Sequence, residues 1–396
     1  MSAILYSTPD QIQSLIDNEV AEGKNLEYKF ELPGGSREER VEFLADVSSF
    51  SNTSGGSILY GILSENGVAI ENPGIENQDL DQAILRMENM IRDSISPRIT
   101  GIQIMPVAAN EARSVLVMSI PKSFNSPHVV DFQGHWRIYG RNSAGKYQLD
   151  IGELRTAFEG TQNRIFRIRD FRAQRLLDIK SQNTPVRLLS NGRISLHLLP
   201  MEFLEREEAI DLGQLTRDGL WIHRNMVPIN GAVTGHRYNM DGYLTFSHSA
   251  NPALAGSYVQ IFRNGIVEAV DSTMLQRQID GHYLLPSLQY EQELKEVFPR
   301  YLQLLSNFGI NLPILCMISL TDVRGYVLGI SQRLAFDMDL QMIPLDRNDL
   351  LIPEVLIQSF DTSPDEVLKP IFDAIWNAFG FLRSFNYNAE GNWDPR

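Results

Sequence analysis

Two carboxylates and an ammonium group lie close together near the N-terminus, at Glu22, Glu27 and Lys29. The segment around them alternates in polarity like a β-strand, so Glu27 and Lys29 are expected to project from one face of that strand. The positions expected to face the core are Leu26, Tyr28 and Phe30. Acids and a base gathered on one face indicate a binding site. The alternative is a solvated ion pair that contributes less than about 1 kcal/mol.

A helix and a glycine turn follow this segment and must position it. Ser36 with Glu39 three residues later is a capping box, which predicts a helix running to about Phe50. Gly55-Gly56 ends the helix and lets the chain turn into a buried strand. Backbone amides of such a turn can cradle a phosphate, with Asn52 either reaching that site or capping the helix. No Gly-Lys-Ser/Thr follows, so the turn is not a P-loop.

Two further groups of cations are candidates for contacts with phosphate. Arg141 and Lys146 flank a Gly- and Ser-containing loop and are predicted to clamp a phosphate group. A helical stretch over 164–175 holds the densest basic run, including Arg167, Arg169 and Arg172. That stretch is either a connecting helix with solvated arginines or a contact with a nucleic-acid backbone.

Composition restricts the class of protein. The chain has 396 residues, a formal net charge of −14 and one cysteine, which excludes an internal disulfide and a multi-cysteine zinc site. We find neither a signal peptide nor a long apolar run, so we expect a cytoplasmic protein without membrane contact. The acidic charge argues against a general DNA-coating role. Contact with nucleic acid is expected to be local and sensitive to salt.

Length and patterning predict an α+β protein with two domains. The first domain spans 1–160 with a mixed sheet, 161–182 form a basic connecting helix, and 183–396 form a second α+β domain with a mostly antiparallel sheet. The sequence features expected in these regions are a helix from Asn77 to Ile95, Asn-Gly hairpins at 190–193 and 263–265, and core or interface tryptophans at Trp221, Trp376 and Trp393. The histidines of the second domain, His223 among them, lack ligand spacing. Its size and aromatic content indicate a sensing or assembly role, including homo-oligomer formation.

Several motifs occur in an order that resembles one known family. They are Glu22-x4-Glu27-x-Lys29, the stretch from Ser49 to Ile62 with its glycine pair, Ile95-Ser96-Pro97, Ile120-Pro121-Lys122-Ser123, Pro127-His128, and Trp136 to Ser143. Together these pieces resemble the Schlafen AlbA-like domain, over about Ile12 to Gly160. The rest of the chain lies outside the resemblance.

The resemblance implies a nucleic-acid-binding domain, and some members of the family are metal-dependent endoribonucleases. It implies Glu22 and Glu27 as ligands of Mg²⁺ or Mn²⁺, which prefer oxygen donors, and Lys29 as a contact to the phosphate. The family commonly has an acid after the glycine-pair strand. Ser64 occupies that place by direct count, and Glu65, one residue later, is the remaining candidate for the catalytic acid.

These expectations lead to one function and its alternatives. The leading hypothesis is metal-dependent cleavage of structured RNA such as tRNA, in bacterial stress or antiphage defence, with RNA favoured over DNA as the partner. The alternatives are a non-catalytic DNA- or RNA-binding or transcription-regulatory module, favoured by Ser64, and an ATP-binding protein that uses the glycine turn.

Overall fold

The computed structural model describes residues 6–76, 80–204, 209–213, 215, 224–330 and 343–395. Trp221, His223 and the first three residues of the helix expected from Asn77 lie outside these ranges. The chain divides into two compact units, Met1–Arg167 and Ile168–Arg396, called here the N-terminal and C-terminal units.

Capping boxes start two helices of the N-terminal unit. The Thr8 hydroxyl accepts a hydrogen bond from the Gln11 amide, and Ser36 does the same with Glu39, with both glutamine and glutamate side chains returning to the cap residue. The helices are α1 (Pro9–Asp17), α2 (Arg37–Asn52), α3 (Leu80–Ser94) and the first part of α4 (Ile151–Lys180). The strands are β1 (Leu26–Lys29), β2 (Gly56–Tyr60), β3 (Leu63–Glu65), β4 (Val68–Glu71), β5 (Ile75–Glu76), β6 (Ile95–Ser96), β7 (Gln103–Ala108), β8 (Arg113–Ile120), β9 (Val129–Phe132), β10 (His135–Asn142) and β11 (Gly145–Gln148).

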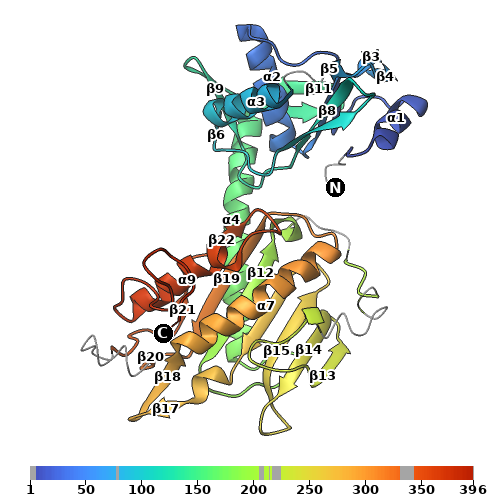
Figure 1. Cartoon of the computed structure of the whole chain (residues 1–396). Helices are drawn as coiled ribbons and strands as arrows, with labels where there is room; N and C mark the ends of the chain where they lie inside the picture. Colours follow the sequence, from blue (N-terminus) through green and yellow to red (C-terminus); the bar gives the residue numbers. More distant parts are fainter. Residues whose placement is uncertain are drawn as a thin grey trace. The chain divides into compact units, whose positions relative to one another are not determined.

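A mixed sheet forms the centre of the N-terminal unit (Figure 1). Its order is β1-β2-β8-β5, with β7 also paired to β8, and only the β1–β2 pair is parallel. Because side chains alternate along β2, Ile58 and Tyr60 pack with α2, whereas Leu59 packs with α1 on the opposite face. The sheet is therefore covered on both faces, and one end of β1 is fixed beside α2.

The glycine pair explains how the chain turns from α2 into β2. Gly55 has a φ of +68°, which favours glycine. A Cβ atom on Gly56 would lie 2.5 Å from both the Asn25 carbonyl oxygen and the Phe50 ring. The turn thus needs two glycines so that backbone and ring can approach closely.

A second, antiparallel sheet has the order β11-β10-β9-β6. Strand β10 continues to Asn142 and turns back into β11, so Arg141 lies directly across from Lys146. Asn66 and Gly67 form the turn that joins β3 to β4, and both residues have positive φ.

The C-terminal unit contains a large antiparallel sheet of order β13-β14-β15-β16-β12-β19-β21, with β22 also paired to β19, and a small sheet of order β17-β18-β20. The strands are β12 (Arg193–Pro200), β13 (Gly235–Tyr238), β14 (Gly242–His248), β15 (Ala255–Phe262), β16 (Val267–Asp271), β17 (Gln278–Ile279), β18 (His282–Pro286), β19 (Ile314–Thr321), β20 (Val327–Gly329), β21 (Leu350–Leu351) and β22 (Val355–Ile357). The helices are α7 (Ser287–Asn307), α9 (Pro364–Ala378) and the short 3-10 turns Met201–Leu204 and Met274–Gln276.

Helices cover both faces of the large sheet. Figure 1 shows α7 lying across it, and α7 and α9 pack with the apolar side chains of β12 and β19 in the main core, where Trp376 is fully buried and Trp393 is partly buried. The last turns of α4 cover the opposite face through Leu176 and Ile179. This arrangement confirms the α+β class and the mostly antiparallel second sheet.

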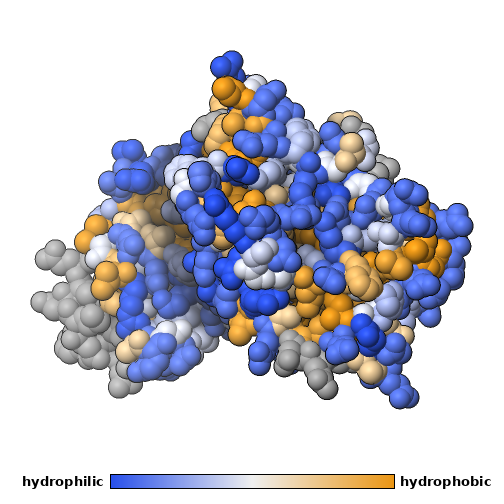
Figure 2. All heavy atoms as spheres, turned by 90° about the horizontal axis from the view of Figure 1, so that it is seen from above, coloured by the Kyte–Doolittle hydropathy of each residue, from blue (hydrophilic) through white to orange (hydrophobic). Residues whose placement is uncertain are grey.

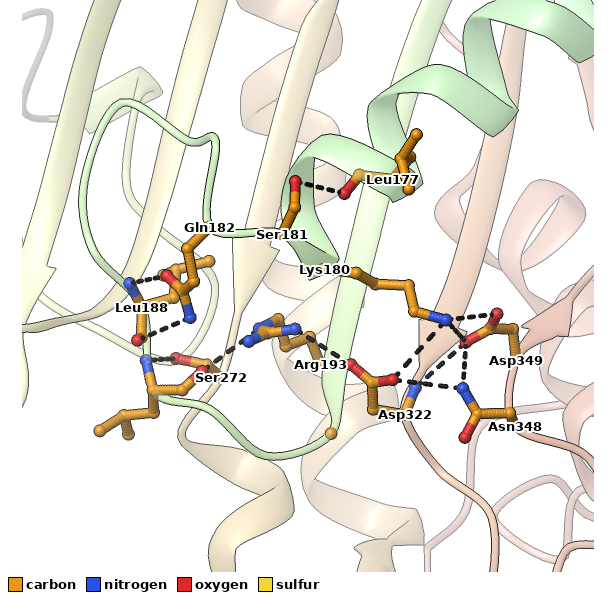
Figure 3. Close-up of polar contacts among 12 residues, drawn as sticks. Leu177, Lys180, Ser181, Gln182, Leu188, Arg193, Ser272, Asp322, Asn348 and Asp349 are labelled. Carbon is orange, nitrogen blue, oxygen red and sulfur yellow. Dashed lines mark hydrogen bonds and ion pairs between the residues drawn. The ribbon is translucent and has the colours of Figure 1, made fainter.

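Ion pairs fix the end of α4 to the C-terminal unit (Figure 3). The Lys180 ammonium lies 2.8 Å from Asp349 and 3.6 Å from Asp322, and Asp322 also accepts from Arg193 at 3.2 Å. One turn earlier, the Arg175 guanidinium contacts the fully buried Glu268 at 2.8 Å. The second half of α4 is therefore a structural element of this unit.

Two local predictions were wrong. Phe30 is 51% exposed because β1 ends at Lys29, one residue before it. The hairpin expected at 190–193 does not form, because Leu188 is held by the Gln182 side chain and the Gly192 amide donates to the Tyr326 hydroxyl. The second Asn-Gly hairpin is confirmed between β15 and β16.

Among the described residues, no helix is long and apolar enough to span a membrane. On the face drawn in Figure 2, hydrophobic side chains reach the surface in separate patches with hydrophilic side chains between them. Scattered apolar side chains of this kind are normal on a protein surface.

Candidate functional site

Six charged side chains from four elements meet in the N-terminal unit. The carboxylates come from β1 and α2 and the cations from β1, β10 and β11. The members of this charge cluster are Glu27, Lys29, Glu42, Asp46, Arg141 and Lys146. Parallel pairing of β1 with β2 and the packing of α2 on that sheet bring them together. The predicted acid–base face of β1 is thus one wall of a larger polar site.

The base of the cluster is buried and its rim is open. The side chains of Asp46 and Arg141 are 3% and 2% exposed, whereas those of Lys29 and Lys146 are 27% and 26% exposed. Asp46 lies 2.7 Å from the Lys146 ammonium and 3.6 Å from that of Lys29. The buried aspartate therefore orients two ammonium groups that remain accessible.

Glu42 lies on the open side of the same two lysines. Its Oε1 atom is 3.2 Å from the Lys29 nitrogen and 3.5 Å from the Lys146 nitrogen. Its side chain is 58% exposed, more than any other in the cluster. One oxygen atom of a solvent-facing carboxylate thus bridges two ammonium groups, as an oxygen of a bound phosphate would.

The surroundings set the protonation of these groups. Burial alone would raise the pKa of Glu27, but the charges and hydrogen bonds of Arg141 and Lys29 outweigh it and lower that pKa. Burial raises the pKa of Asp46 although Lys146 and Lys29 oppose this effect. Burial would lower the pKa of Lys29, but Asp46 and Glu27 raise it instead. Lys29 is therefore firmly charged at neutral pH.

Glu22 faces its own strand. Its Oε1 atom accepts a hydrogen bond from the Tyr28 amide at 2.8 Å, and burial, with the charge of Glu27 adding to it, raises the pKa of Glu22. Glu65 is exposed at the end of β3, and Ser64 precedes it on the same strand. Among the described residues, no ion pair joins Glu22, Ser64 or Glu65 to the charge cluster.

Both carboxylate oxygens of Glu27, one of the two predicted metal ligands, are paired with cations. One oxygen of Glu27 is 3.0 Å from the Lys29 ammonium, and the other pairs with the Arg141 guanidinium. Within the described ranges, no group of three or more His, Cys, Asp or Glu side chains is placed to hold a metal ion. A divalent cation at Glu22 and Glu27 would have to displace both cationic partners of Glu27.

The predicted phosphate-binding turn has a structural role. The Asn52 amide group donates to the carbonyl oxygens of His128 and Tyr139 at 3.1 and 2.9 Å and accepts from the His128 amide at 2.6 Å. Gly55 and Gly56 are closed in by neighbouring backbone atoms. The assignment of Asn52, Gly55 and Gly56 to phosphate binding is therefore corrected, because their polar groups and surrounding space are already used.

Two of the predicted cationic contacts are also corrected. Arg141 is buried, stacks 4.2 Å over the Phe50 ring and pairs with Glu27, so it supports the cluster from below. Arg172 is buried and donates to Ser319 and the Ile318 carbonyl oxygen. Lys146 stays accessible, as do Arg167 and Arg169 on the exposed side of α4.

The sequence analysis missed Glu42 and Asp46. A signal for Asp46 was present, because it is the one charged residue inside the apolar run Phe43–Val47 of a helix. A charge in a buried stripe requires a partner, and this one has three. Glu42 has no comparable signal.

Comparison with known families identifies part of the N-terminal unit. The N-terminal unit is an α+β domain that carries the charge cluster between β1, α2 and the β10–β11 hairpin. Residues 22–150 match the family model described as Schlafen, AlbA_2, and this part of the chain is a Schlafen AlbA_2 domain. That assignment confirms the family resemblance and relates the domain to nucleic acids.

The other comparisons add little. No curated protein matches the chain. A crystal structure of the DIP2311 protein from Corynebacterium diphtheriae is similar at 17% identity and a TM-score of 0.24. The similarity covers 36% of this chain and 26% of that one.

Proposed function

We propose that the N-terminal unit binds nucleic acid without cleaving it, through the ammonium groups of Lys29 and Lys146. The observation that carries the proposal is the bridge from Glu42 to both lysines, 3.2 and 3.5 Å long. A phosphate oxygen can replace this carboxylate while Asp46 keeps the lysines in position. With Glu42 displaced, the three cations of the cluster outnumber its two remaining carboxylates, which gives a chain with a net charge of −14 the local positive site that a polyanion requires.

The assay is equilibrium binding of labelled RNA and DNA of one sequence, single-stranded and hairpin, in EDTA, between about 50 and 200 mM salt. Affinity should fall with salt. The Lys29→Gln/Lys146→Gln variant should bind more weakly and lose roughly 0.7 to 0.9 from the logarithmic salt slope, because the one phosphate contact that both lysines share disappears. Lys29→Arg/Lys146→Arg should retain both properties and controls for folding. Equal binding by the Gln and Arg variants contradicts the proposal.

A substitution at Glu42 should change nucleic-acid affinity in the opposite direction to the lysine substitutions. Because its carboxylate competes with phosphate, Glu42→Gln should bind nucleic acid more tightly than the unchanged protein. Glu31→Gln, an exposed acid outside the cluster, is the matched control. Weaker binding by Glu42→Gln would mean that this carboxylate takes part in recognition and would overturn the exchange with phosphate.

Metal-dependent RNA cleavage, the activity implied by some family members, is tested separately. The protein is incubated with total tRNA and Mn²⁺ beside a Glu22→Gln/Glu27→Gln variant. Under the binding proposal neither protein cleaves. Cleavage that the variant lacks would show that one or both of these carboxylates act in catalysis, and it would refute the non-catalytic role.

A further inference from the structure

A pocket of about 260 Å³ opens between the start of α2 and the strands β9 and β10. This volume lies near the lower end for small-ligand sites. Arg37 and Val41 line it from α2, and Val130, Phe132, Arg137 and Tyr139 line it from the two strands. None of these residues belongs to the charge cluster, so the pocket is a separate feature of the same unit.

The rim of the pocket carries cations that have no partner. Arg37 from α2 and Arg137 from β10 are exposed and make no hydrogen bond or ion pair within the described part of the chain. Although the protein has an excess of acids, these two arginines line one pocket without an anionic partner, and together they can bind an anion. Planar guanidinium groups match phosphate through paired hydrogen bonds.

The floor of the pocket is apolar. Val130 and Tyr139 are buried, and Phe132 and Val41 are partly buried beside them. An inorganic anion alone would leave this floor against water, whereas a planar ring would cover it. Stacking of a base on an aromatic side chain contributes about 1–3 kcal/mol.

The remaining lining groups fit a sugar or a base. Glu38 is the one acid that lines the pocket, and its carboxylate needs a donor such as a ribose hydroxyl or a base amine. His135 lies on the open side and can donate or accept a hydrogen bond. We propose that this pocket binds a nucleoside phosphate, with the phosphate between Arg37 and Arg137 and the base over Phe132 and Tyr139.

The nucleoside phosphate in this pocket could be part of a bound nucleic-acid strand or a free mononucleotide. Arg37 and Glu42 are on one helix, about 7.5 Å apart along its axis at about 1.5 Å per residue, which corresponds to roughly two nucleotide steps of a strand. A nucleic acid bound at Lys29 and Lys146, as proposed above, could place one of its nucleotides here. A free mononucleotide could bind without that contact.

Calorimetric titration of the full chain with each of the four ribonucleoside 5′-monophosphates tests the pocket directly. If the pocket takes a free nucleotide, at least one should bind, and both inorganic phosphate and the matching nucleoside should bind about tenfold or more weakly. Arg37→Gln/Arg137→Gln should weaken binding at least about tenfold. Arg40→Gln, an exposed arginine on the same helix, should not change it. Lys29→Gln/Lys146→Gln should also leave it unchanged, so the two proposals fail separately.

The same variants in the oligonucleotide assay identify the source. Mononucleotide binding that depends on Arg37 and Arg137 supports a free ligand. Absence of mononucleotide binding, together with loss of oligonucleotide affinity in Arg37→Gln/Arg137→Gln but not in Arg40→Gln, supports a nucleotide of a strand. If the arginine variants change neither measurement, the pocket is not a nucleoside phosphate site. Equal affinity for inorganic phosphate and mononucleotide would overturn the role of the apolar floor.

Discussion

Replacing Arg141 by methionine tests how the charge cluster is held together. The guanidinium is buried, pairs with Glu27, donates to the Gly23 carbonyl oxygen at 3.2 Å and stacks over Phe50. Methionine keeps most of the volume over the ring and removes the charge. Breaking a buried ion pair on one side costs about 3–5 kcal/mol, and we expect about 3 kcal/mol because Lys29 still compensates Glu27.

A double-mutant cycle with Glu27→Gln isolates the pair. Glu27→Gln alone should cost about 1–2 kcal/mol, since the glutamine oxygen still accepts a hydrogen bond. The double variant should cost about as much as Arg141→Met alone, which gives a coupling energy of about 1–2 kcal/mol. Additive losses would refute the assignment of this pair as the link between β1 and β10.

The pH dependence provides an independent check. In the unchanged protein the lowered pKa of Glu27 contributes stability above its unfolded value, and this contribution is lost as the pH falls through the lower folded value. Without Arg141 that contribution is smaller at neutral pH. The cost of Arg141→Met should therefore shrink below about pH 4.3, where Glu27 becomes protonated in the unfolded chain.

Native-state hydrogen exchange of peptides from 22–150 is the appropriate measurement, because it reports on the N-terminal unit by itself, whereas a single melting curve would combine the two compact units. A cost that stays constant from neutral to acid pH would show that Arg141 stabilises the fold through its contacts with Phe50 and the Gly23 carbonyl oxygen and not through the charge of Glu27.

Three further outcomes follow from the structure. Burial would raise the pKa of Glu268, but its hydrogen bonds hold that pKa at about 2 against an ordinary value of 4.5. The C-terminal unit should therefore lose roughly 3 kcal/mol of stability between about pH 4.5 and about pH 2 in urea titrations. A Glu268→Gln variant should lack this loss. Gly56→Ala should cost about 2–4 kcal/mol because its Cβ would overlap backbone and ring atoms, whereas Gly35→Ala meets nothing within 4 Å and should be neutral in the same exchange experiment. Arg172→Met should destabilise the C-terminal unit by about 2–3 kcal/mol and leave nucleic-acid affinity unchanged, whereas Arg169→Met should not affect stability.

Local chemistry made much of the N-terminal unit predictable. The capping box at Ser36 and the glycine pair need only neighbouring residues, and both were recognised from the sequence. The alternation of β1 placed Glu27 and Lys29 together for the same reason. Phe30 shows the limit of this reasoning, because the period of a strand does not reveal where the strand stops.

The partners inside the cluster could not be predicted in this way. Arg141 meets Glu27 across 114 positions of sequence, and the contact depends on how β10 crosses α2. The same limit applies to Arg172, which belongs to a basic run in the sequence but turns inward to β19. The Asn-Gly pair at 191–192 also does not form the predicted hairpin, because the Gly192 amide donates a hydrogen bond to the hydroxyl of Tyr326, which is distant in the sequence.

If a phosphate exchanges with the carboxylate of Glu42 as proposed, the surface over the two lysines is selective for polyvalent anions. Glu42 belongs to the same chain and is therefore always present beside the lysines. A small monovalent anion gains little binding free energy by displacing its carboxylate. A polymer offers several phosphates at once, so one of them can expel Glu42 while its neighbours form contacts elsewhere. Chloride and free carboxylates should therefore compete poorly at this surface, and chain length should matter more than the strength of any single contact.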